Sequence, residues 1–264
     1  MDSPFQRKKT LLFLILSSIF LTNAVLAELI GVKIFSGEAS LGLPPAHLNL
    51  FADTPFDFNL TAGVIIWPVV FITTDIINEY FGKEGVKKIS IITVCLILYT
   101  FLVITVITNL PPAAFWLDVN SKTPDGKPFD IDYAFNSIYR QGGGIIIGSV
   151  CAFLLGQLLD ASVFHWLRQL TGKKKIWLRA TGSTLVSQLV DTVVVLFVAF
   201  YVFGNWTLTM VFSVSIINYL YKFFVAIIMT PILYVAHAII DKYLGINQAN
   251  QLVTEAAQDR SIVS

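Results

Sequence analysis

The sequence has few charged residues for its size. Asp, Glu, Lys and Arg make up 13% of its 264 residues, whereas soluble domains carry roughly 25%. Hydrophobic residues make up 55% and gather in long runs. This shortage of charge excludes an ordinary soluble domain and indicates a protein that lies mostly in lipid. The net charge of +1 provides no basic surface for nucleic acid, so none is expected as a partner.

Residues that bind metals or form disulfides are also scarce. Cys95 and Cys151 lie inside apolar runs without a C-x-x-C spacing, so we expect two inert, buried thiols. The three histidines are scattered near the ends of apolar runs, with no H-E-x-x-H motif. No metal or other cofactor is therefore expected. The absence of a G-x-x-x-x-G-K-[ST] motif excludes ATP hydrolysis by the chain itself.

What the sequence does contain is a series of six apolar stretches, each long enough to cross a bilayer as a helix of about 20 residues. They cover residues 11–34, 60–81, 88–110, 141–164, 180–203 and 209–240. The predicted fold is an all-α integral membrane protein with six transmembrane helices. One transmembrane domain spans residues 1–245, and a polar C-terminal tail spans residues 246–264. Pro68 and Pro231 are expected to kink the second and sixth helices.

The first apolar stretch has two interpretations. Basic residues at 7–9, followed by an apolar run that ends at Ala27, resemble a cleaved secretory signal. Apolar character continues to Ile34, however, which favours a retained first helix. We expect the retained helix, because the charge pattern of the connections fits six helices better than five.

Positive charge alternates between the connections. Basic residues lie before the first apolar stretch and after the second, fourth and sixth stretches. They are Arg7, Lys8, Lys9, Lys83, Lys87, Lys88, Arg168, Lys173, Lys174, Lys175, Arg179, Lys242 and Arg260. The remaining connections are acidic and contain Glu38, Asp53, Asp57, Asp118, Asp125, Asp130 and Asp132. Because Lys and Arg gather on the cytoplasmic side of a membrane, both termini are predicted to be cytoplasmic. The five tryptophans, Trp67 among them, are expected at the membrane interfaces.

Polar side chains recur inside several stretches, where lipid alone would not tolerate them. A charge at the bilayer centre costs at least ~2.5–3.5 kcal/mol, so such groups must face one another, water or a polar ligand. Spacings of three and four residues place each set on one helix face. The sets are Asp75, Asn78 and Glu79; Gln157 and Asp160; Gln188 and Asp191; and Asn218 and Lys222. Together they predict a polar internal site that binds a small molecule, as in a transporter.

Each set also has a structural interpretation. Glu79 can be a solvated residue at a helix end, with Gly82 as the C-cap. Gln188 can serve as a hydrogen-bonding contact between helices. Lys222 is expected to neutralise one of the three aspartates, either within the site or in a purely structural salt bridge.

Several motifs resemble those of the queuosine precursor transporter family, also called the vitamin uptake transporter family. They occupy residues 74–82, 157–164, 177–192 and 218–222, in order, within residues 60–240. The resemblance implies a six-helix protein of the bacterial inner membrane that imports 7-cyano- and 7-aminomethyl-7-deazaguanine, or queuine, for tRNA modification. One departure is Gly144, where the family leads us to expect a basic residue. Whether Arg140, one turn earlier, serves instead stays open.

The polar residues suit such a ligand on chemical grounds as well. A deazaguanine presents adjacent N–H donors to a carboxylate, a carbonyl oxygen to an amide or ammonium, and a flat ring to an aromatic side chain. Other heteroaromatic amides or vitamins would fit too. We expect a secondary transporter whose partners are this substrate and membrane lipid, with assembly into a homo-oligomer left open. The alternative is a substrate-binding subunit for a separate ATPase. An intramembrane aspartyl protease is disfavoured, because neither Asp160 nor Asp191 lies in a G-x-G-D motif.

Overall fold

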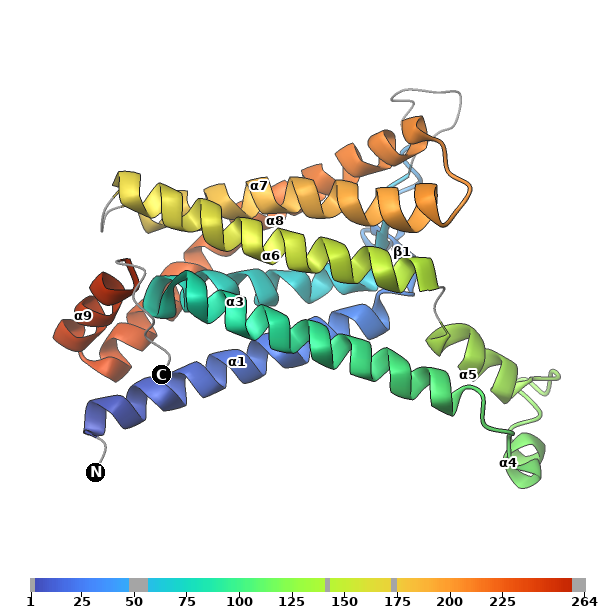
Figure 1. Ribbon diagram of the computed structural model, residues 1–264. Coiled ribbons are helices and arrows are strands. Elements are labelled where there is room, and N and C mark those ends of the chain that lie inside the picture. Colours follow the sequence, from blue (N-terminus) through green and yellow to red (C-terminus); the bar gives the residue numbers. More distant parts are fainter. Residues whose placement is uncertain (1–2, 48–56, 141–142, 172–174, 258–264) are drawn as a thin grey trace.

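The computed structural model describes residues 3–47, 57–140, 143–171 and 175–257, and it is predominantly helical (Figure 1). Within these residues, five helices are long and apolar enough to cross a membrane. They are α1 (Pro4–Ile30), α3 (Trp67–Ile107), α6 (Gly143–Thr171), α7 (Ile176–Leu196) and α8 (Leu208–Leu244), with the π-helical turn η2 (Phe197–Val202) continuing α7. This architecture agrees with the predicted all-α membrane protein.

Short elements connect the long helices. Between α1 and α3 lie β1 (Ile34–Ser36), α2 (Gly37–Ser40), β2 (Asn59–Thr61) and the 3-10 turn η1 (Ala62–Ile65). The two strands pair antiparallel, with Phe35 opposite Leu60. Between α3 and α6 lie α4 (Ala114–Val119) and α5 (Ile131–Tyr139), and α9 (Ile246–Ala257) follows α8. The two long connections are thus locally ordered and small, as their many turn residues predict.

Helix α3 is divided at Gly82. This residue has φ 71° and ψ −178°, a backbone conformation that glycine adopts far more readily than other residues. In Figure 1 the chain approaches the break in one direction and leaves it in nearly the opposite direction, so the two parts of α3 form a hairpin. The predicted stretches 60–81 and 88–110 both fall in this element. The predicted connection between them is wrong in length, because Lys83 to Lys88 are already helical.

Capping explains where other helices begin. Ser3 accepts a hydrogen bond from the Gln6 N–H, and Pro4 follows at the first position, so α1 starts before the predicted residue 11. Pro68 lies in the first turn of α3, where its missing N–H costs no helical bond. The prediction that Pro68 interrupts a helix is therefore wrong. Pro231 does lie inside α8, which continues on both sides of it.

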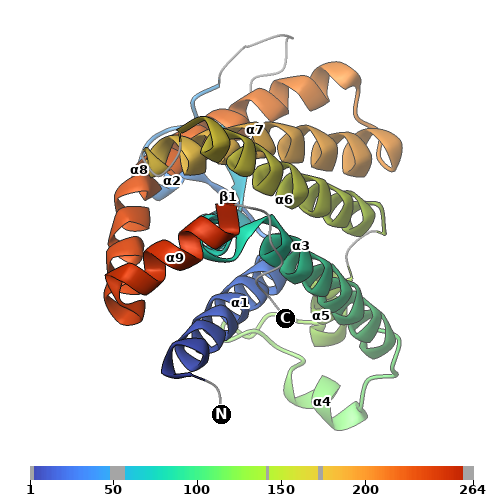
Figure 2. The ribbon, with the colours of Figure 1, turned by 60° about the vertical axis from the view of Figure 1, so that its left-hand side comes forward.

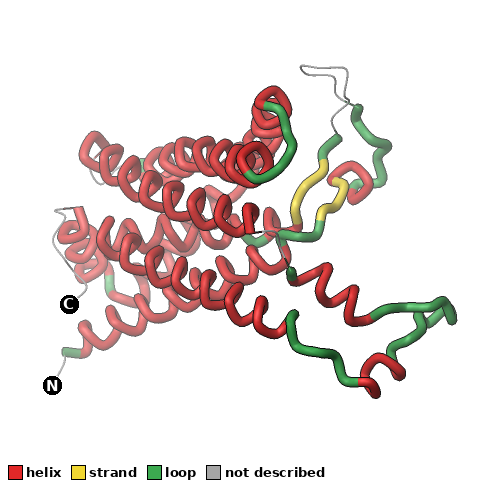
Figure 3. The backbone as a smooth tube through the Cα atoms, turned by 45° about the vertical axis from the view of Figure 1, so that its right-hand side comes forward, coloured by secondary structure: helices red, strands yellow, loops and turns green. Residues whose placement is uncertain are grey.

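The two ends of the helix bundle carry different elements (Figures 1 and 3). The N-terminus, the break in α3 and α9 lie at one end, whereas the strands, α4 and α5 lie at the other. The predicted basic connections therefore share one end and the acidic connections the other. Asp53, Lys173, Lys174, Arg260 and the rest of residues 258–264 lie outside the described residues.

Small residues bring α6 close to α7. A Cβ atom added to Gly156 would lie 3.4 Å from the Asp191 Cβ, and one added to Gly148 would lie 3.1 Å from the Ala199 backbone nitrogen. The predicted close approach at these glycines is therefore present. Because the backbones are so near, polar side chains of α6 and α7 meet in the middle of the bundle.

The C-terminal helix α9 packs across the end of the bundle, beside α3 and α8 (Figure 2). Its apolar face buries Ala249, Leu252 and Ala256. The carbonyl oxygen of Ala256 would lie 3.1 Å from a Cβ atom at Gly82, so α9 rests directly on the break in α3. Residues 246–257 thus pack on the transmembrane helices, whereas a polar tail was predicted there.

The start of α1 also contacts the end of α8. The Lys8 ammonium donates a hydrogen bond of 2.9 Å to the Tyr243 carbonyl oxygen and lies 5.4 Å from the centre of its ring. Charge-assisted and cation–π contacts of this kind contribute modestly at exposed positions.

The two cysteines are exposed on the outer surface of the bundle. The prediction of buried thiols is therefore wrong, although their apolar surroundings were read correctly. An apolar run in a membrane helix has a lipid-facing side as well as an interior side, and sequence alone does not separate the two.

Glu38 organises the connection between α1 and α3. Its carboxylate accepts hydrogen bonds from the Ser36 hydroxyl at 2.9 Å and from the Phe58 N–H at 2.6 Å. These bonds favour the anion, and the Phe58 N–H in particular holds the pKa of Glu38 below its usual range. Glu38 therefore joins the two halves of this connection as a charged acceptor.

Candidate functional site

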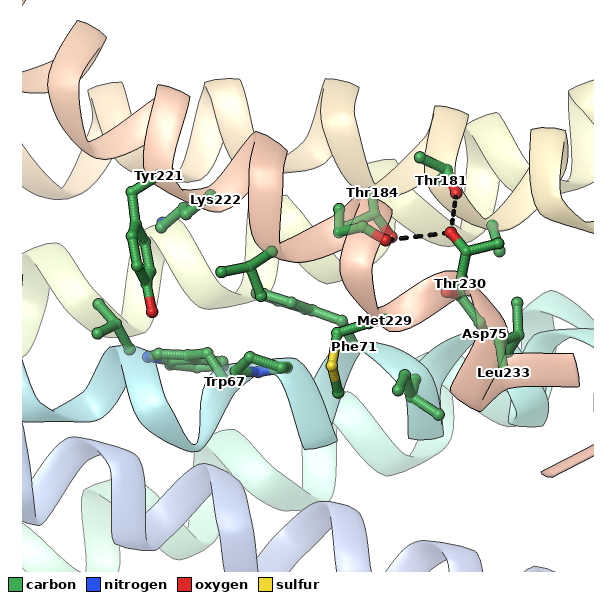
Figure 4. A pocket seen from close by; sticks show the side chains of 16 residues that line it. Trp67, Phe71, Asp75, Thr181, Thr184, Tyr221, Lys222, Met229, Thr230 and Leu233 are labelled. Carbon is green, nitrogen blue, oxygen red and sulfur yellow. Dashed lines mark hydrogen bonds between the residues drawn. The ribbon is translucent and has the colours of Figure 1, made fainter. Parts of the chain in front are cut away.

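Two adjoining pockets lie among the long helices. The apolar pocket has about 560 Å³ of space between atoms, part of it open to the surroundings (Figure 4). It lies between α3, α7 and α8, and its lining residues are Val64, Trp67, Pro68, Phe71, Ile72, Asp75, Ala180, Thr181, Thr184, Tyr221, Lys222, Val225, Ala226, Met229, Thr230 and Leu233. Most of these side chains are hydrocarbon, and Asp75 and Lys222 are the charged residues among them.

The polar pocket is smaller, with about 280 Å³, and lies between α3, α6 and α7. Its lining residues are Trp67, Phe71, Phe153, Gly156, Gln157, Asp160, Ser187, Gln188 and Asp191. Both predicted Q-x-x-D pairs thus meet here, as their shared helix faces indicated. Gly156 leaves the space in which α7 approaches α6.

Trp67 and Phe71 line both pockets. One helical turn separates them on α3, and their rings stack with centroids 5.7 Å apart and planes 17° apart. Trp67 also contacts the Phe153 ring at 5.9 Å. The sequence places Trp67 at a membrane interface, but the structure turns its ring inward between the pockets. These two residues form what we call the aromatic divider.

Asp75 points into the apolar pocket from α3 (Figure 4). Its residue surface is only 6% exposed. The Oδ1 atom is buried and receives no hydrogen bond from the part of the chain that the structure describes. A buried carboxylate oxygen without a donor is costly, which suits a place where a ligand supplies the missing donor.

The polar pocket also has unused acceptors. Asp160 Oδ1 accepts a hydrogen bond of 3.2 Å from the Ser187 hydroxyl, whereas Asp160 Oδ2 and Gln188 Oε1 receive none from any described residue. Gln157 Oε1 is already engaged, because the Thr74 hydroxyl donates to it at 3.0 Å. The pocket therefore offers acceptors from two helices to a ligand with N–H groups.

Lys222 and Asp191 form an ion pair between the two pockets. Lys222 Nζ lies 2.7 Å from Asp191 Oδ2, and the two side chains are 18% and 20% exposed. The sequence allowed Lys222 to pair with Asp75, Asp160 or Asp191, and in the structure it pairs with Asp191. Lys222 lines the apolar pocket and Asp191 the polar pocket, so this pair spans their boundary.

Glu79 lies outside both pockets. It pairs with Arg179 through two oxygens at 2.8 and 3.0 Å, and both residues are buried. Arg168 lies 3.5 Å from the same carboxylate and donates to the Glu79 and Val253 carbonyl oxygens at 3.0 and 2.6 Å. The solvated helix-end interpretation of Glu79 is therefore wrong. Glu79 instead holds α3, α6, α7 and α9 together at one end of the bundle.

Asn78 and Asn218 also lie outside the pocket linings. The Asn78 amide donates to the Ala161 carbonyl oxygen at 3.4 Å, which joins α3 to α6. The Asn218 amide donates to the Val214 carbonyl oxygen of its own helix at 3.0 Å. Arg140, the candidate substitute for a basic residue at Gly144, bonds Asn109 at 2.5 Å and lines neither pocket.

Sequence reasoning missed the aromatic divider, Tyr221 and the threonines of the apolar pocket. Thr181 and Thr230 bond one another at 3.1 Å across α7 and α8 (Figure 4). The sequence did carry a signal for the aromatic divider, because Phe71 and Trp67 lie about one and two helical turns before Asp75, on the same face of α3. Among the described residues, no group of His, Cys, Asp and Glu could hold a metal ion.

The similarity of this chain to known proteins covers the helices that line the two pockets. The family profile described as "Putative vitamin uptake transporter" matches residues 61–236. A "Probable queuosine precursor transporter" of Bacillus subtilis is 28% identical over 186 residues, which cover 70% of this chain and 75% of that protein. A protein of the same description from Haemophilus influenzae is 30% identical over 187 residues, covering 68% of this chain and 69% of that protein.

A "Queuosine precursor transporter" of Escherichia coli is 26% identical over 177 residues, which cover 65% of this chain and 69% of that protein. No solved structure matches the chain. The matched region contains α3, α6, α7 and most of α8, the helices that line the two pockets.

Proposed function

Because the chain belongs to the vitamin uptake transporter family, we propose that it carries queuosine precursors across the inner membrane of a bacterium. Membership of a transporter family makes it a membrane transporter rather than an enzyme. The proposed substrates are 7-cyano-7-deazaguanine and 7-aminomethyl-7-deazaguanine, with queuine as a further substrate.

The observation that carries the substrate proposal is the set of unused acceptors beside the aromatic divider. A deazaguanine ring that stacks on Trp67 can direct its adjacent N–H groups toward Asp160 Oδ2 and Gln188 Oε1. Charge-assisted hydrogen bonds to the carboxylate would be the strongest of these contacts. Guanine shares this edge, so discrimination against it must come from the five-membered ring and its substituent.

The nine residues assigned to the site by sequence would act in two ways. We propose that Asp75, Gln157, Asp160, Gln188, Asp191 and Lys222 line the path of the substrate, since all of them line a pocket. Asn78, Glu79 and Asn218 line neither pocket, and we propose that they fix the helices around it. Their direct contact with substrate stays a prediction.

We propose six membrane crossings, with the two parts of α3 crossing separately. The reversal at Gly82 supports this count, and the gathering of the basic connections at one end supports cytoplasmic termini. The transmembrane domain would then comprise residues 1–245. Residues 246–264 would form a cytoplasmic extension, of which α9 lies against the bundle.

Secondary transport is the proposed mode, since the chain itself has no phosphate-binding loop for ATP, and the alternative is a subunit that works with a separate ATPase. The test is uptake of labelled 7-aminomethyl-7-deazaguanine by vesicles that contain only the purified protein and no ATP. Uptake under an ion gradient, or by exchange, is the expected result. Tight binding without uptake, restored by an added ATPase module, would instead show a substrate-binding subunit.

Substrate choice is tested separately by binding measurements on the purified protein. The cyano, aminomethyl and queuine compounds should bind at least tenfold more tightly than guanine or xanthine. Equal affinity for guanine, or tighter binding of a vitamin such as riboflavin, would contradict the proposed substrate class.

A further inference from the structure

The position of Asp75 indicates how the two pockets divide a substrate between them. We propose that the substrate ring lies in the polar pocket, that its substituent enters the apolar pocket, and that Asp75 there binds a protonated amine on the substituent. This inference rests on the proposed function, because it concerns the substrate of the same site. It adds a specificity residue and a preference for cationic substituents.

The two pockets share part of their walls. Trp67 and Phe71 contribute to both linings, so the two pockets meet at the aromatic divider. The polar acceptors belong to α6 and α7, whereas Asp75 belongs to α3 and points into the apolar pocket beside Leu233 of α8 (Figure 4). A ring whose N–H edge meets Asp160 therefore directs its opposite edge toward the apolar pocket.

The charges around the apolar pocket favour a cation beside Asp75. The other charged residue of its lining, Lys222, is held by Asp191 at 2.7 Å. The nearest acidic neighbour on α3, Glu79, is paired with Arg179. No salt bridge within the described ranges reaches Asp75. A protonated amine would supply both the positive charge and the donor that the buried Oδ1 atom lacks.

The apolar pocket also has the size and the lining to hold a substituent. The apolar pocket has about twice the volume of the polar pocket, roughly 560 against 280 Å³. Val225, Met229 and Leu233 provide hydrocarbon surface for the carbon atoms of a substituent. A short aminomethyl group, or a longer arm with a secondary amine, could therefore place its nitrogen near Asp75 while its carbons contact these side chains.

A neutral, protonated Asp75 is the competing explanation for its missing partner. A protonated carboxyl group would not attract an ammonium, so cationic and neutral substituents of the same size would bind equally. Comparing 7-aminomethyl-7-deazaguanine with its neutral 7-hydroxymethyl analogue at pH 7 separates the two explanations in the wild-type protein, without any variant.

The experiment measures binding of the aminomethyl, hydroxymethyl and cyano compounds to the purified wild type, Asp75→Asn and Asp160→Asn. A charge-assisted hydrogen bond should make wild-type affinity for the aminomethyl compound roughly ten- to hundredfold higher than for the hydroxymethyl analogue. Asp75→Asn should remove this preference and weaken binding of the aminomethyl compound more than binding of the cyano compound. Asp160→Asn, the matched control, should weaken all three ligands by a similar factor.

Equal wild-type affinity for the aminomethyl and hydroxymethyl compounds would overturn the inference, whether or not either variant folds. An Asp75→Asn variant that loses all three ligands equally would also overturn it, because Asp75 would then contact the ring. In both cases the proposed substrate class would stand. Failure of the wild type to bind any of the three more tightly than guanine would overturn the proposed function, and the inference with it.

Discussion

Lys222 of α8 donates to Asp191 of α7 across a distance of 2.7 Å, and each residue faces a different pocket. Any ligand that engages Asp191 or Lys222 must compete with this pair or bind beside it. The pair can therefore hold α7 and α8 together as well as contact substrate, and the two roles lead to different results on substitution.

Lys222→Met leaves the Asp191 carboxylate without its partner and should destabilise the protein. We expect a loss of ~1–3 kcal/mol, below the ~3–5 kcal/mol of a fully buried pair, because the side chains are 18% and 20% exposed. Thermal unfolding in detergent would measure it. The double variant Lys222→Met/Asp191→Asn should recover most of the stability but none of the substrate binding. Recovery of binding along with stability would show that the pair is structural.

The aromatic divider predicts a second set of results. Trp67→Ala removes a stacking surface from both pockets and should weaken deazaguanine binding at least tenfold, whereas Trp67→Phe should retain most of it. Trp177→Ala, which removes an indole outside both linings, is the matched control. Isothermal titration calorimetry would measure the affinity of each variant for the deazaguanine. Similar affinities in Trp67→Ala and the wild type would exclude stacking on this residue.

Glu79→Gln should act on stability rather than on substrate recognition. The change removes the negative charge that pairs with the buried Arg179 at 2.8 Å, which we expect to cost ~3–5 kcal/mol. Asp125→Asn, in an exposed turn, serves as the control and should change nothing. Yield, melting temperature and affinity should be measured on the same preparations. A well-folded Glu79→Gln protein that no longer binds substrate would place Glu79 in the binding site after all.

The six-crossing topology predicts where single cysteines react. In a Cys95→Ala/Cys151→Ala background, Asp125→Cys should react with an impermeant maleimide in intact cells, and Lys87→Cys only after permeabilisation. Both native residues are exposed, so the second depends only on which side of the membrane the break in α3 occupies. The reverse pattern of labelling would rule out cytoplasmic termini.

Glu38 predicts an effect of pH on the connection between α1 and α3. Its pKa is lowered in the folded protein, so its contacts stabilise this connection fully above the unfolded pKa of about 4.3 and less as pH falls through the folded pKa. Hydrogen exchange of the Phe58 amide, corrected for its intrinsic rate, should therefore increase at acid pH. Glu38→Gln should show fast exchange already at pH 7 and little dependence on pH. Equal protection of wild type and variant at pH 7 would contradict this role.

The sequence was a good guide to which helices carry polar groups. The three-residue spacing of Gln157 with Asp160, and of Gln188 with Asp191, correctly placed both pairs on facing surfaces, because helical periodicity is a local property. For the ion-pair partner of Lys222, the sequence left three candidates: Asp75, Asp160 and Asp191. Choosing Asp191 requires the rotation of α7 against α8, which depends on packing along the whole interface.

The surroundings of Glu79, which the sequence allowed to be a solvated helix end, show a different limit. Its spacing from Asp75 is helical, but Arg168 and Arg179 lie 89 and 100 residues further along the chain, and their approach decides its surroundings. Trp67 was not assigned to the site, because its sequence position alone suggested a different environment. Its position at a helix start suits a membrane interface, and only the inward rotation of its ring brings it between the pockets.

The bond from Lys8 to Tyr243 has a consequence for biosynthesis. Its donor belongs to the first turns of α1, and its acceptor lies 235 residues later, in the last turn of α8. A ribosome that has released α1 must still translate nearly the whole chain before this contact can form. The first helix can therefore pack against α3 early, but it can contact α8 only after the other long helices described here have been made, and a chain that ends before Tyr243 would lack that contact.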